Sequence, residues 1–186
     1  NTGKEGLQHD LSYLQHGPQL YISGYGRVFL SSAIKMAKYV AETPYALSAD
    51  QLNLLSEFSR NTYLKTFRSR YIDFNVEGRG ISRPGTLRKS SEKYLFNDML
   101  SVDAGNKTIW QNKISRIDSA NSHAYYINPY HKHFWKGDYV IHVRPEYSFN
   151  VRMVSNRTSR SETGNEQNLF GRYLSDGATN LQRRGP

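Results

Sequence analysis

The sequence contains no cysteine among its 186 residues. Disulfide bonds and thiolate metal sites are therefore excluded, and the chain is compatible with any redox compartment. No apolar run approaches the length of a membrane span, and the first residues carry no secretory signal pattern. Internal repeats and low-complexity segments are absent as well. A membrane protein is therefore not expected, and no membrane partner is predicted.

The chain is strongly basic and rich in tyrosine. Lys and Arg number 25 against 16 Asp and Glu, which gives a net charge of +9, and there are 14 Tyr. This charge favours an acidic partner: nucleic acid, an anionic membrane or an acidic polysaccharide. Tyrosine rings and hydroxyls suit sugar binding, although they also suit single-stranded nucleic acid. The basic residues are scattered over both halves and form no phosphate-spaced stripe, so nucleic acid is not predicted as a partner.

The first half of the chain has a helical pattern, and its length allows one sizeable core or two small ones. Ser48 and Gln51 form a capping box before one predicted helix. A glycine-rich turn is predicted over residues 76–84. Helical patterns follow from Thr86 to Met99 and, more weakly, over 107–117. Two apolar stripes mark the first helices: Leu30, Ala33, Ile34, Ala37, Val40 and Ala41, and then Leu52, Leu55, Phe58 and Phe67.

Beyond Ser119 the period changes to that of strands. Residues 123–127, 139–144 and 147–154 are rich in Tyr, Val, Ile and Phe and alternate in polarity. Helices followed by strands indicate an α+β fold with segregated parts or two domains. We place the boundary near residue 120, which gives residues 1–120 and 121–186.

A histidine and a tyrosine precede the first predicted helix, nine residues apart. His16 stands before a Gly-Pro turn, and Tyr25 lies between Gly24 and Gly26. Both side chains exchange protons, and the glycines allow backbone and ligand to approach closely. This arrangement suits proton abstraction beside a carboxylate. An isolated pair of this kind is more often simply packed at a helix start.

Further polar residues can join this pair. Arg79 and Arg83 lie in the glycine-rich turn and can grip carboxylates or sulfates, although a solvated basic loop is the commoner case. Glu162 and Asn165 follow a predicted strand. They can pair an arginine, orient an imidazole or bind a hydroxyl, or they form an ordinary polar turn.

Two other features favour the simpler interpretation. The segment His131-Lys-His133 has the spacing of a metal pair but lacks a third ligand, so no metal site is predicted. Trp110 and Trp135 could stack on sugar, although tryptophan more often belongs to a core.

Six segments together resemble the family-eight polysaccharide lyases, and most closely the members that cleave chondroitin. The resemblance covers nearly the whole chain and weakens over residues 107–122. It is carried by residues 13–20, 23–29, 43–48, 73–84, 148–155 and 171–180.

The resemblance implies a fold, a location and a partner. The expected fold is multidomain α+β: the C-terminal part of an α/α toroid, followed by the first strands of an antiparallel β-sandwich domain. Such enzymes are secreted or periplasmic bacterial proteins. The chain would then be an internal piece of a longer protein, with the rest of its own polypeptide as a partner. An asparagine that grips the substrate carboxylate and an aromatic sugar-stacking patch would lie upstream of residue 1.

The resemblance also implies a reaction, the β-elimination of a hexosaminyl–uronate bond with no cofactor and no metal. His16 would help to mask the uronate carboxylate, and Tyr25 would act as base and then as acid. Arg79 would favour the phenolate, and Glu162 would hold Arg79 and His16. Arg83 would contact the uronate or the leaving group.

The implied role of Asn165 is to help hold the Arg79–Glu162 pair. The implied partner is an acidic polysaccharide: chondroitin sulfate, with hyaluronan as a second candidate, while xanthan is cleaved by relatives with a similar set of residues. Dermatan would need a base on the opposite face. The alternative is a non-catalytic binding module for acidic glycans, which would not need a tyrosine beside an arginine.

Overall fold

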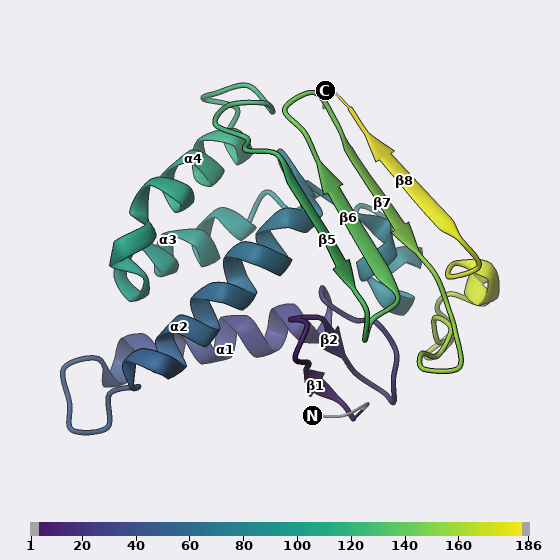
Figure 1. The fold of residues 1–186 in the computed structure, drawn as a ribbon, viewed down its shortest axis with the longest axis horizontal. Coiled ribbons are helices and arrows are strands. Elements are labelled where there is room, and N and C mark those ends of the chain that lie inside the picture. Colours follow the sequence, from purple (N-terminus) through teal and green to yellow (C-terminus); the bar gives the residue numbers. More distant parts are fainter. Residues whose placement is uncertain (1–3, 184–186) are drawn as a thin grey trace.

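The computed structural model describes residues 4–183, in which a helical first part is followed by an antiparallel sheet (Figure 1). Two short hairpins, β1–β2 and β3–β4, accompany the helices. The elements are β1 (Gly6–Leu7), β2 (Tyr13–Leu14), α1 (Tyr25–Val40), α2 (Ala49–Phe58), β3 (Phe67–Arg68), β4 (Tyr71–Ile72), α3 (Glu92–Val102), α4 (Lys107–Ile117), β5 (Tyr130–Phe134), β6 (Tyr139–Val143), β7 (Ser148–Arg152) and β8 (Ala178–Gln182).

The first two helices follow the predicted signals. In α1 the residues Leu30, Ile34 and Ala37 are buried, at the spacing of one helix face. The predicted capping box of α2 is confirmed: Ser48 Oγ accepts from the Gln51 backbone N at 3.3 Å, and Gln51 Oε1 accepts from the Ser48 backbone N at 2.9 Å. These reciprocal bonds satisfy two amide groups that a helix start leaves free.

Two helical expectations need correction. Phe67 is buried as predicted, but it lies in β3 and not on the α2 helix. The helix expected from Thr86 begins only at Glu92. Gly85 there has φ 72°, a left-handed conformation that interrupts a helix, and the Lys89 backbone N donates to the Arg70 carbonyl at 2.8 Å.

The strands pair in chain order, β5-β6-β7-β8, as an antiparallel meander. The predicted strands 139–144 and 147–154 are confirmed as β6 and β7. The expected strand at 123–127 is wrong, because these residues form a turn that the end of α4 holds: Arg116 Nη1 donates to the Tyr125 carbonyl at 2.7 Å. The strands β5 and β8, in which few residues are buried, were not predicted from the sequence.

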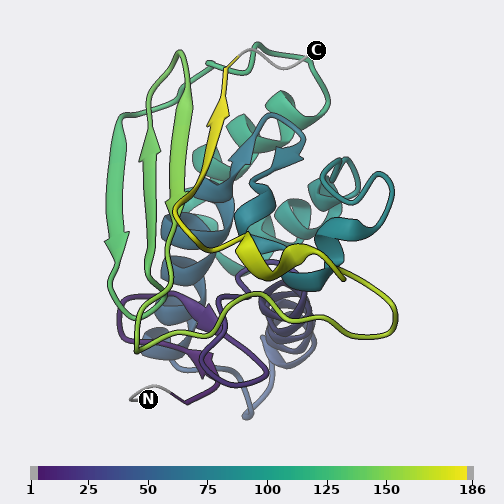
Figure 2. The same cartoon turned by 90° about the vertical axis from the view of Figure 1, so that its right-hand side faces the viewer.

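Helices and sheet share one hydrophobic core. A single cluster of buried side chains includes Ile34 of α1, Phe58 of α2, Trp110 of α4 and Ile141 of β6. Of the two possibilities left open by chain length, the structure therefore has the single core. Figure 2 shows the sheet standing along one side of the helices. No helix within residues 4–183 has the length and apolarity to cross a membrane.

Candidate active site

A turn between β2 and α1 presents the histidine. The Tyr21 backbone N donates to the Tyr13 carbonyl at 2.8 Å, which closes the turn. His16 and Gly17 within it have φ values of 57° and 81°. This left-handed backbone is uncommon for a residue other than glycine and clusters at functional sites. The His16 ring meets the edge of the Tyr25 ring, with centroids 4.6 Å apart.

The arginine lies on a turn that the sheet holds in place. Asp73 begins this turn and accepts hydrogen bonds from the Asn75 backbone N at 3.0 Å and from Asn180 Nδ2 at 2.8 Å. Arg152 Nη1 of β7 donates to the Asn75 carbonyl at 2.9 Å. Arg79 follows in the next helical turn, so contacts from β7 and β8 hold the turn that precedes it, while its guanidinium is bonded to Glu162 and Tyr25.

The long connection between β7 and β8 returns to the histidine turn (Figure 2). The Ser159 backbone N donates to the Pro18 carbonyl at 2.9 Å, and the Glu162 backbone N donates to Gln19 Oε1 at 2.6 Å. These two bonds dock the connection on the turn. Glu162 thereby reaches a point between His16 and Arg79.

Glu162 joins the predicted site residues into one network. Its Oε2 lies 2.7 Å from His16 Nδ1, and its Oε1 accepts from Arg79 Nη1. Arg79 Nη2 donates to Tyr25 Oη at 3.3 Å. The structure therefore brings His16, Tyr25, Arg79 and Glu162 together.

The charges of this network are fixed by its own hydrogen bonds. Burial alone would raise the pKa of Glu162, but hydrogen bonds from His16 and Arg79 outweigh burial and lower it. The hydrogen bond to Tyr25 raises the pKa of Arg79; burial opposes the shift, and Glu162 adds to it. Since an ionised carboxylate only accepts hydrogen bonds, His16 Nδ1 carries a proton and Nε2 is left for a ligand.

The two remaining predicted residues lie at the edge of this network. Arg83 is exposed and donates from Nε and Nη2 to Gln167 Oε1, at 3.2 and 3.0 Å. Asn165 is exposed, and its side chain makes no hydrogen bond with residues 4–183. The bracing role of Asn165 stays a prediction. Asn168 also braces this loop: its Nδ2 donates to the Glu162 carbonyl at 2.8 Å.

Tyr21 is a second site residue that sequence reasoning missed. Its hydroxyl donates to Glu162 Oε1 at 3.2 Å and accepts from the Arg79 backbone N at 3.2 Å. Burial raises its pKa to about 12, with the neighbouring Glu162 adding to the shift. The sequence shows only a tyrosine four residues before Tyr25, and a buried core tyrosine explains this spacing equally well.

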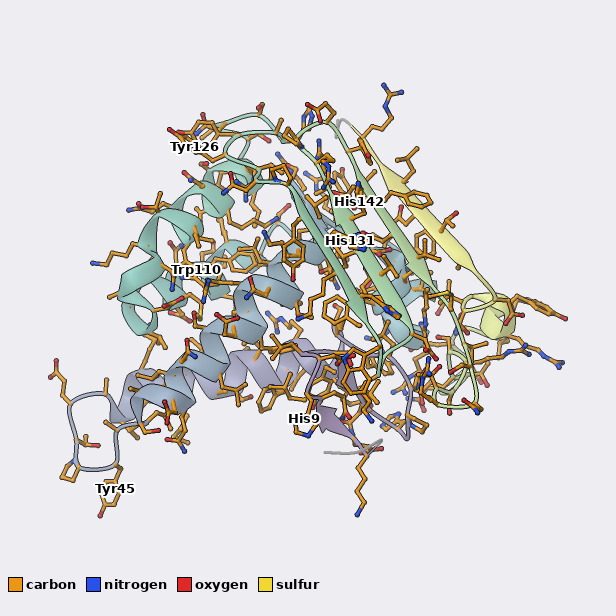
Figure 3. All side chains as sticks on the ribbon, viewed as in Figure 1. His9, Tyr45, Trp110, Tyr126, His131 and His142 are labelled. Carbon is orange, nitrogen blue, oxygen red and sulfur yellow. The ribbon has the colours of Figure 1, made fainter. Side chains whose placement is uncertain are left out.

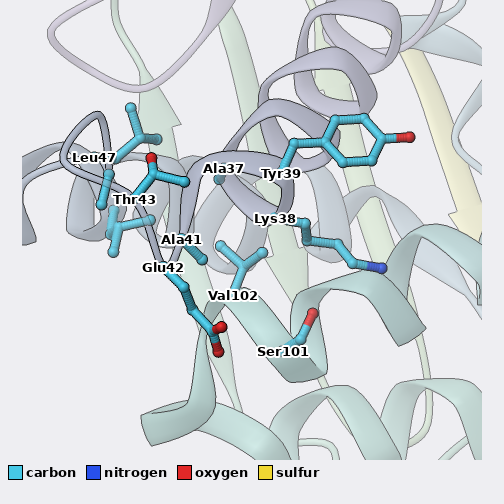
Figure 4. A pocket seen from close by; sticks show the side chains of 11 residues that line it. Ala37, Lys38, Tyr39, Ala41, Glu42, Thr43, Leu47, Ser101 and Val102 are labelled. Atoms are coloured by element: carbon cyan, nitrogen blue, oxygen red, sulfur yellow. The ribbon is translucent and has the colours of Figure 1, made fainter.

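An open cleft of about 520 Å³ lies in front of the network, between the start of α1 and the arginine turn. Tyr25, Arg79 and Arg83 line it, together with Arg27 and Lys89. Glu77 and Glu92 also line the cleft and pair with Lys89 at 3.0 Å and with Arg27 at 3.1 Å. The four cations still exceed the two carboxylates, and this excess suits an acidic ligand. A second hollow lies at the far end of α1 (Figure 4), where one cation, Lys38, is balanced by one carboxylate, Glu42, and none of the predicted site residues lines it. We therefore take the first cleft as the candidate site.

The other residues considered earlier lie elsewhere. His131 and His142 stand side by side on β5 and β6, with Nδ1 atoms 3.3 Å apart (Figure 3). In residues 4–183 no group of three or more His, Cys, Asp or Glu is arranged to hold a metal. Trp110 is completely buried and stacks on Phe96, so it cannot meet a sugar, whereas Trp135 is exposed.

Comparison with known proteins identifies the family. The profile of the polysaccharide lyase family 8 N-terminal alpha-helical domain matches residues 1–119. The chain belongs to polysaccharide lyase family 8. The profile of the super-sandwich domain of this family matches residues 129–186.

Individual lyases are also similar. Chondroitinase-AC of Pedobacter heparinus is 57% identical over 183 residues, which are 98% of this chain and 26% of that protein. The chain thus spans about a quarter of this relative's length. A chondroitinase AC lyase solved as enzyme–oligosaccharide complexes superposes with a TM-score of 0.98 at 56% identity, over 100% of this chain and 28% of the other.

More distant lyase structures share the fold. A Paenibacillus xanthan lyase has a TM-score of 0.81 at 20% identity, over 98% of this chain and 20% of its own. A Streptomyces coelicolor chondroitin AC lyase in complex with chondroitin sulphate has a TM-score of 0.78 at 18% identity, over 100% and 30%. The arrangement of helices and sheet is therefore retained where most of the sequence has changed.

Proposed function

We propose that this chain carries most of the active site of a lyase that cleaves hexosaminyl–glucuronate bonds of chondroitin sulfate by β-elimination. Hyaluronan is the second candidate substrate. One observation carries the proposal: Glu162 binds both His16 and Arg79, and Arg79 binds the hydroxyl of Tyr25 at 3.3 Å. Identity to chondroitinase-AC of Pedobacter heparinus supports the choice of substrate.

The first step removes the proton at C5 of the uronate. This proton is weakly acidic because the adjacent carboxylate is already negative, so the enolate-like intermediate needs donors that mask this charge. His16 is our candidate donor through Nε2 in its doubly protonated, imidazolium form, since Nδ1 donates its own proton to Glu162 at 2.7 Å. Tyr25, as phenolate, takes the proton. The guanidinium of Arg79 beside its oxygen stabilises that negative charge.

The second step breaks the bond between C4 and the glycosidic oxygen. The electron pair of the C5 carbanion forms the C4–C5 double bond, and the leaving oxygen takes the proton that Tyr25 received. In glucuronate both groups leave from the same face, so one phenol serves both steps and returns to its starting form. Arg83, at the edge of the cleft, would contact the uronate or the leaving group.

The proposal extends to the surroundings of this chain. We infer that the helices are the end of an α/α toroid and that the sheet begins a β-sandwich, with further parts of the polypeptide completing the substrate groove. A polymeric substrate too large to enter a cell favours a secreted or periplasmic location. The fold shared with xanthan lyase and chondroitin AC lyase supports the inferred arrangement of helices and sheet.

The test is the ultraviolet absorbance of 4,5-unsaturated uronate, measured with the longest natural form of this protein. Chondroitin sulfate, hyaluronan and dermatan sulfate are supplied in parallel. We expect the fastest rise with chondroitin sulfate and none with dermatan. Tyr25→Phe should lower the rate by roughly 10³-fold or more, because it removes the group that moves the proton.

Tyr39→Phe is the matched control, since Tyr39 also lies on α1 but is 79% exposed at its far end. It should keep the wild-type rate. No rise with any of the three polymers would contradict the proposed substrate and redirect the assay to xanthan. Binding of chondroitin sulfate that is retained by Tyr25→Phe, with no elimination by the wild type, would favour a non-catalytic binding module.

A further inference from the structure

Tyr21 contacts every member of the candidate network, yet the proposed reaction gives it no role. It is 3% exposed and lines the cleft. Its ring makes a T-shaped contact with the Tyr25 ring, and the two ring centroids are 5.0 Å apart. It makes a second T-shaped contact with the His16 ring, and these centroids are 6.3 Å apart. Its hydroxyl bonds to Glu162 and to the Arg79 backbone, each at 3.2 Å.

Two glycines hold the Tyr21 ring. A Cβ added at Gly24 would lie 2.6 Å from Tyr21 Cε1, and a Cβ added at Gly78 would overlap the end of the ring. Both glycines also have positive φ, at 54° and 59°. Gly24 begins the helix that carries Tyr25, and Gly78 directly precedes Arg79. The ring therefore fills the space where the helix start and the arginine turn approach each other.

The hydroxyl of Tyr21 has a fixed direction. It receives the backbone N–H of Arg79, so its own proton points to Glu162. Because burial raises the pKa of Tyr21 to about 12, the hydroxyl keeps this proton at neutral pH. Tyr21 is thus a permanent donor, and Tyr25 is the tyrosine left to exchange protons with substrate.

We propose that Tyr21 is a positioning residue: its hydroxyl fixes the Glu162 carboxylate against Arg79 and His16, and its ring sets the orientation of Tyr25. This inference rests on the proposed function. Glu162 arrives on a long connection and has 20% of its side chain exposed, so its carboxylate needs an anchor from the body of the protein. Tyr21 supplies this anchor from the wall of the cleft, which it lines although it is only 3% exposed.

The experiment compares Tyr21→Phe with wild type in the longest natural form of the protein, using the unsaturated-uronate assay. Phenylalanine keeps the ring between Gly24 and Gly78 and removes only the hydroxyl. We expect kcat to fall by about tenfold to a hundredfold with KM changed by less than about twofold, since the lost bonds orient the reacting groups and bind no substrate.

Tyr139→Phe is the matched control for the loss of a buried phenol. Tyr139 is fully buried and donates to the Asp73 carboxylate, but it borders no part of the cleft. It should lower the melting temperature and leave kcat within about twofold of wild type. Equal losses of kcat in both variants, each following the melting temperature, would make Tyr21 a merely structural residue and overturn the proposal.

A double-mutant cycle shows whether Tyr21 acts through Glu162. In the Glu162→Gln background the Tyr21→Phe change should cost less than about threefold in kcat, because the carboxylate that it positions is already gone. Additive losses would overturn the proposal, as would an unchanged kcat for Tyr21→Phe in an active enzyme. If the wild type itself catalyses no elimination, the proposed function is overturned together with the role of Tyr21. If the wild type is active and one of the outcomes above is found, only the role of Tyr21 is overturned.

Discussion

Two clusters in this chain contain the same three kinds of side chain, a tyrosine, an arginine and a carboxylate. In the open cluster, Tyr25 and Arg79 border the cleft and Glu162 bonds to Arg79, and Glu162 and Arg79 keep 20% and 15% of their side chains exposed. In the sealed cluster, Tyr139, Arg152 and Asp73 are at most 1% exposed. The kinds of residue are alike, so chemistry depends on what surrounds them.

The two carboxylates differ in whether all their hydrogen-bond partners are internal and in the direction of their pKa shifts. Asp73 accepts from Tyr139, Asn180 and the Asn75 backbone, and all its partners are internal. Burial raises the pKa of Asp73, and these hydrogen bonds only partly offset it, whereas Glu162 has its pKa lowered. The sealed cluster ties the arginine turn to the sheet, and the open cluster keeps its tyrosine and histidine available for a ligand.

The largest expected contrast comes from removing each arginine. Arg79→Met should lower kcat/KM by roughly 10³-fold with little change in stability, because it removes the charge beside the Tyr25 oxygen. Arg152→Met should instead lower the free energy of unfolding by about 3 kcal/mol, since it takes a buried cation from beside Asp73. Elimination rates and urea unfolding of both variants measure the contrast. A catalytic loss from Arg152→Met at unchanged stability would break it.

The next contrast concerns the glycine that supports the open cluster. Gly78→Ala should destabilise the protein by about 3 kcal/mol, because a left-handed alanine is strained and its Cβ would overlap the Tyr21 ring. Gly85→Ala is the matched control: φ is 72° there, but a Cβ would meet no atom within 4 Å. It should cost only the backbone strain, about 1 kcal/mol. Similar losses in urea unfolding would mean that the Tyr21 ring does not depend on Gly78.

Local signals in the sequence predicted the elements whose pattern is complete within a few residues. The capping box at Ser48 and the alternation of β6 are of this kind. The strands β5 and β8 were missed because their neighbours, and not their own sequences, decide their burial. In β8 the inward positions are only half-buried and two of the three, Asn180 and Gln182, are polar, so the apolar–polar alternation that marks a strand is absent from its sequence.

The candidate site divides in a similar way. His16, Tyr25, Arg79 and Glu162 were named through the resemblance to a family, which records residues that meet in space. Tyr21 and Asn168 act by contacts with Glu162 that the long connection makes after folding. No periodicity or spacing reveals such contacts. The role of Asn165 stays a prediction for the same reason, since two asparagines of one loop differ only in which way the folded loop turns them.

A smaller effect tests how the open cluster is braced. Asn168→Ala should lower the free energy of unfolding by about 1–2 kcal/mol, because the Glu162 carbonyl loses a buried donor. It should also lower kcat, since Glu162 then has one less restraint. Asn165→Ala, at an exposed position on the same loop, should change the stability by less than about 0.5 kcal/mol. A larger loss of stability in Asn165→Ala than in Asn168→Ala, measured by thermal unfolding, would make Asn165 the residue that braces the loop.

The smallest effect is a difference in pH dependence between the two carboxylates, tested with Glu162→Gln and Asp73→Asn. The folded pKa of Glu162 lies below its ordinary value of 4.5, so its stabilisation is complete above that pH and is lost as pH falls through the folded value. The folded pKa of Asp73 lies above its ordinary value of 3.8, so its contribution is complete below that pH and is lost as pH rises through the folded value.

The two variants should therefore diverge from wild type in opposite directions. Urea unfolding between about pH 3 and pH 7 should show the advantage of wild type over Glu162→Gln growing with pH, while its advantage over Asp73→Asn shrinks. Slopes of the same sign would mean that the carboxylates share one environment, and the division into an open and a sealed cluster would fail. Opposite slopes would show that Glu162 is held ionised by His16 and Arg79, the state in which it can orient both toward a substrate.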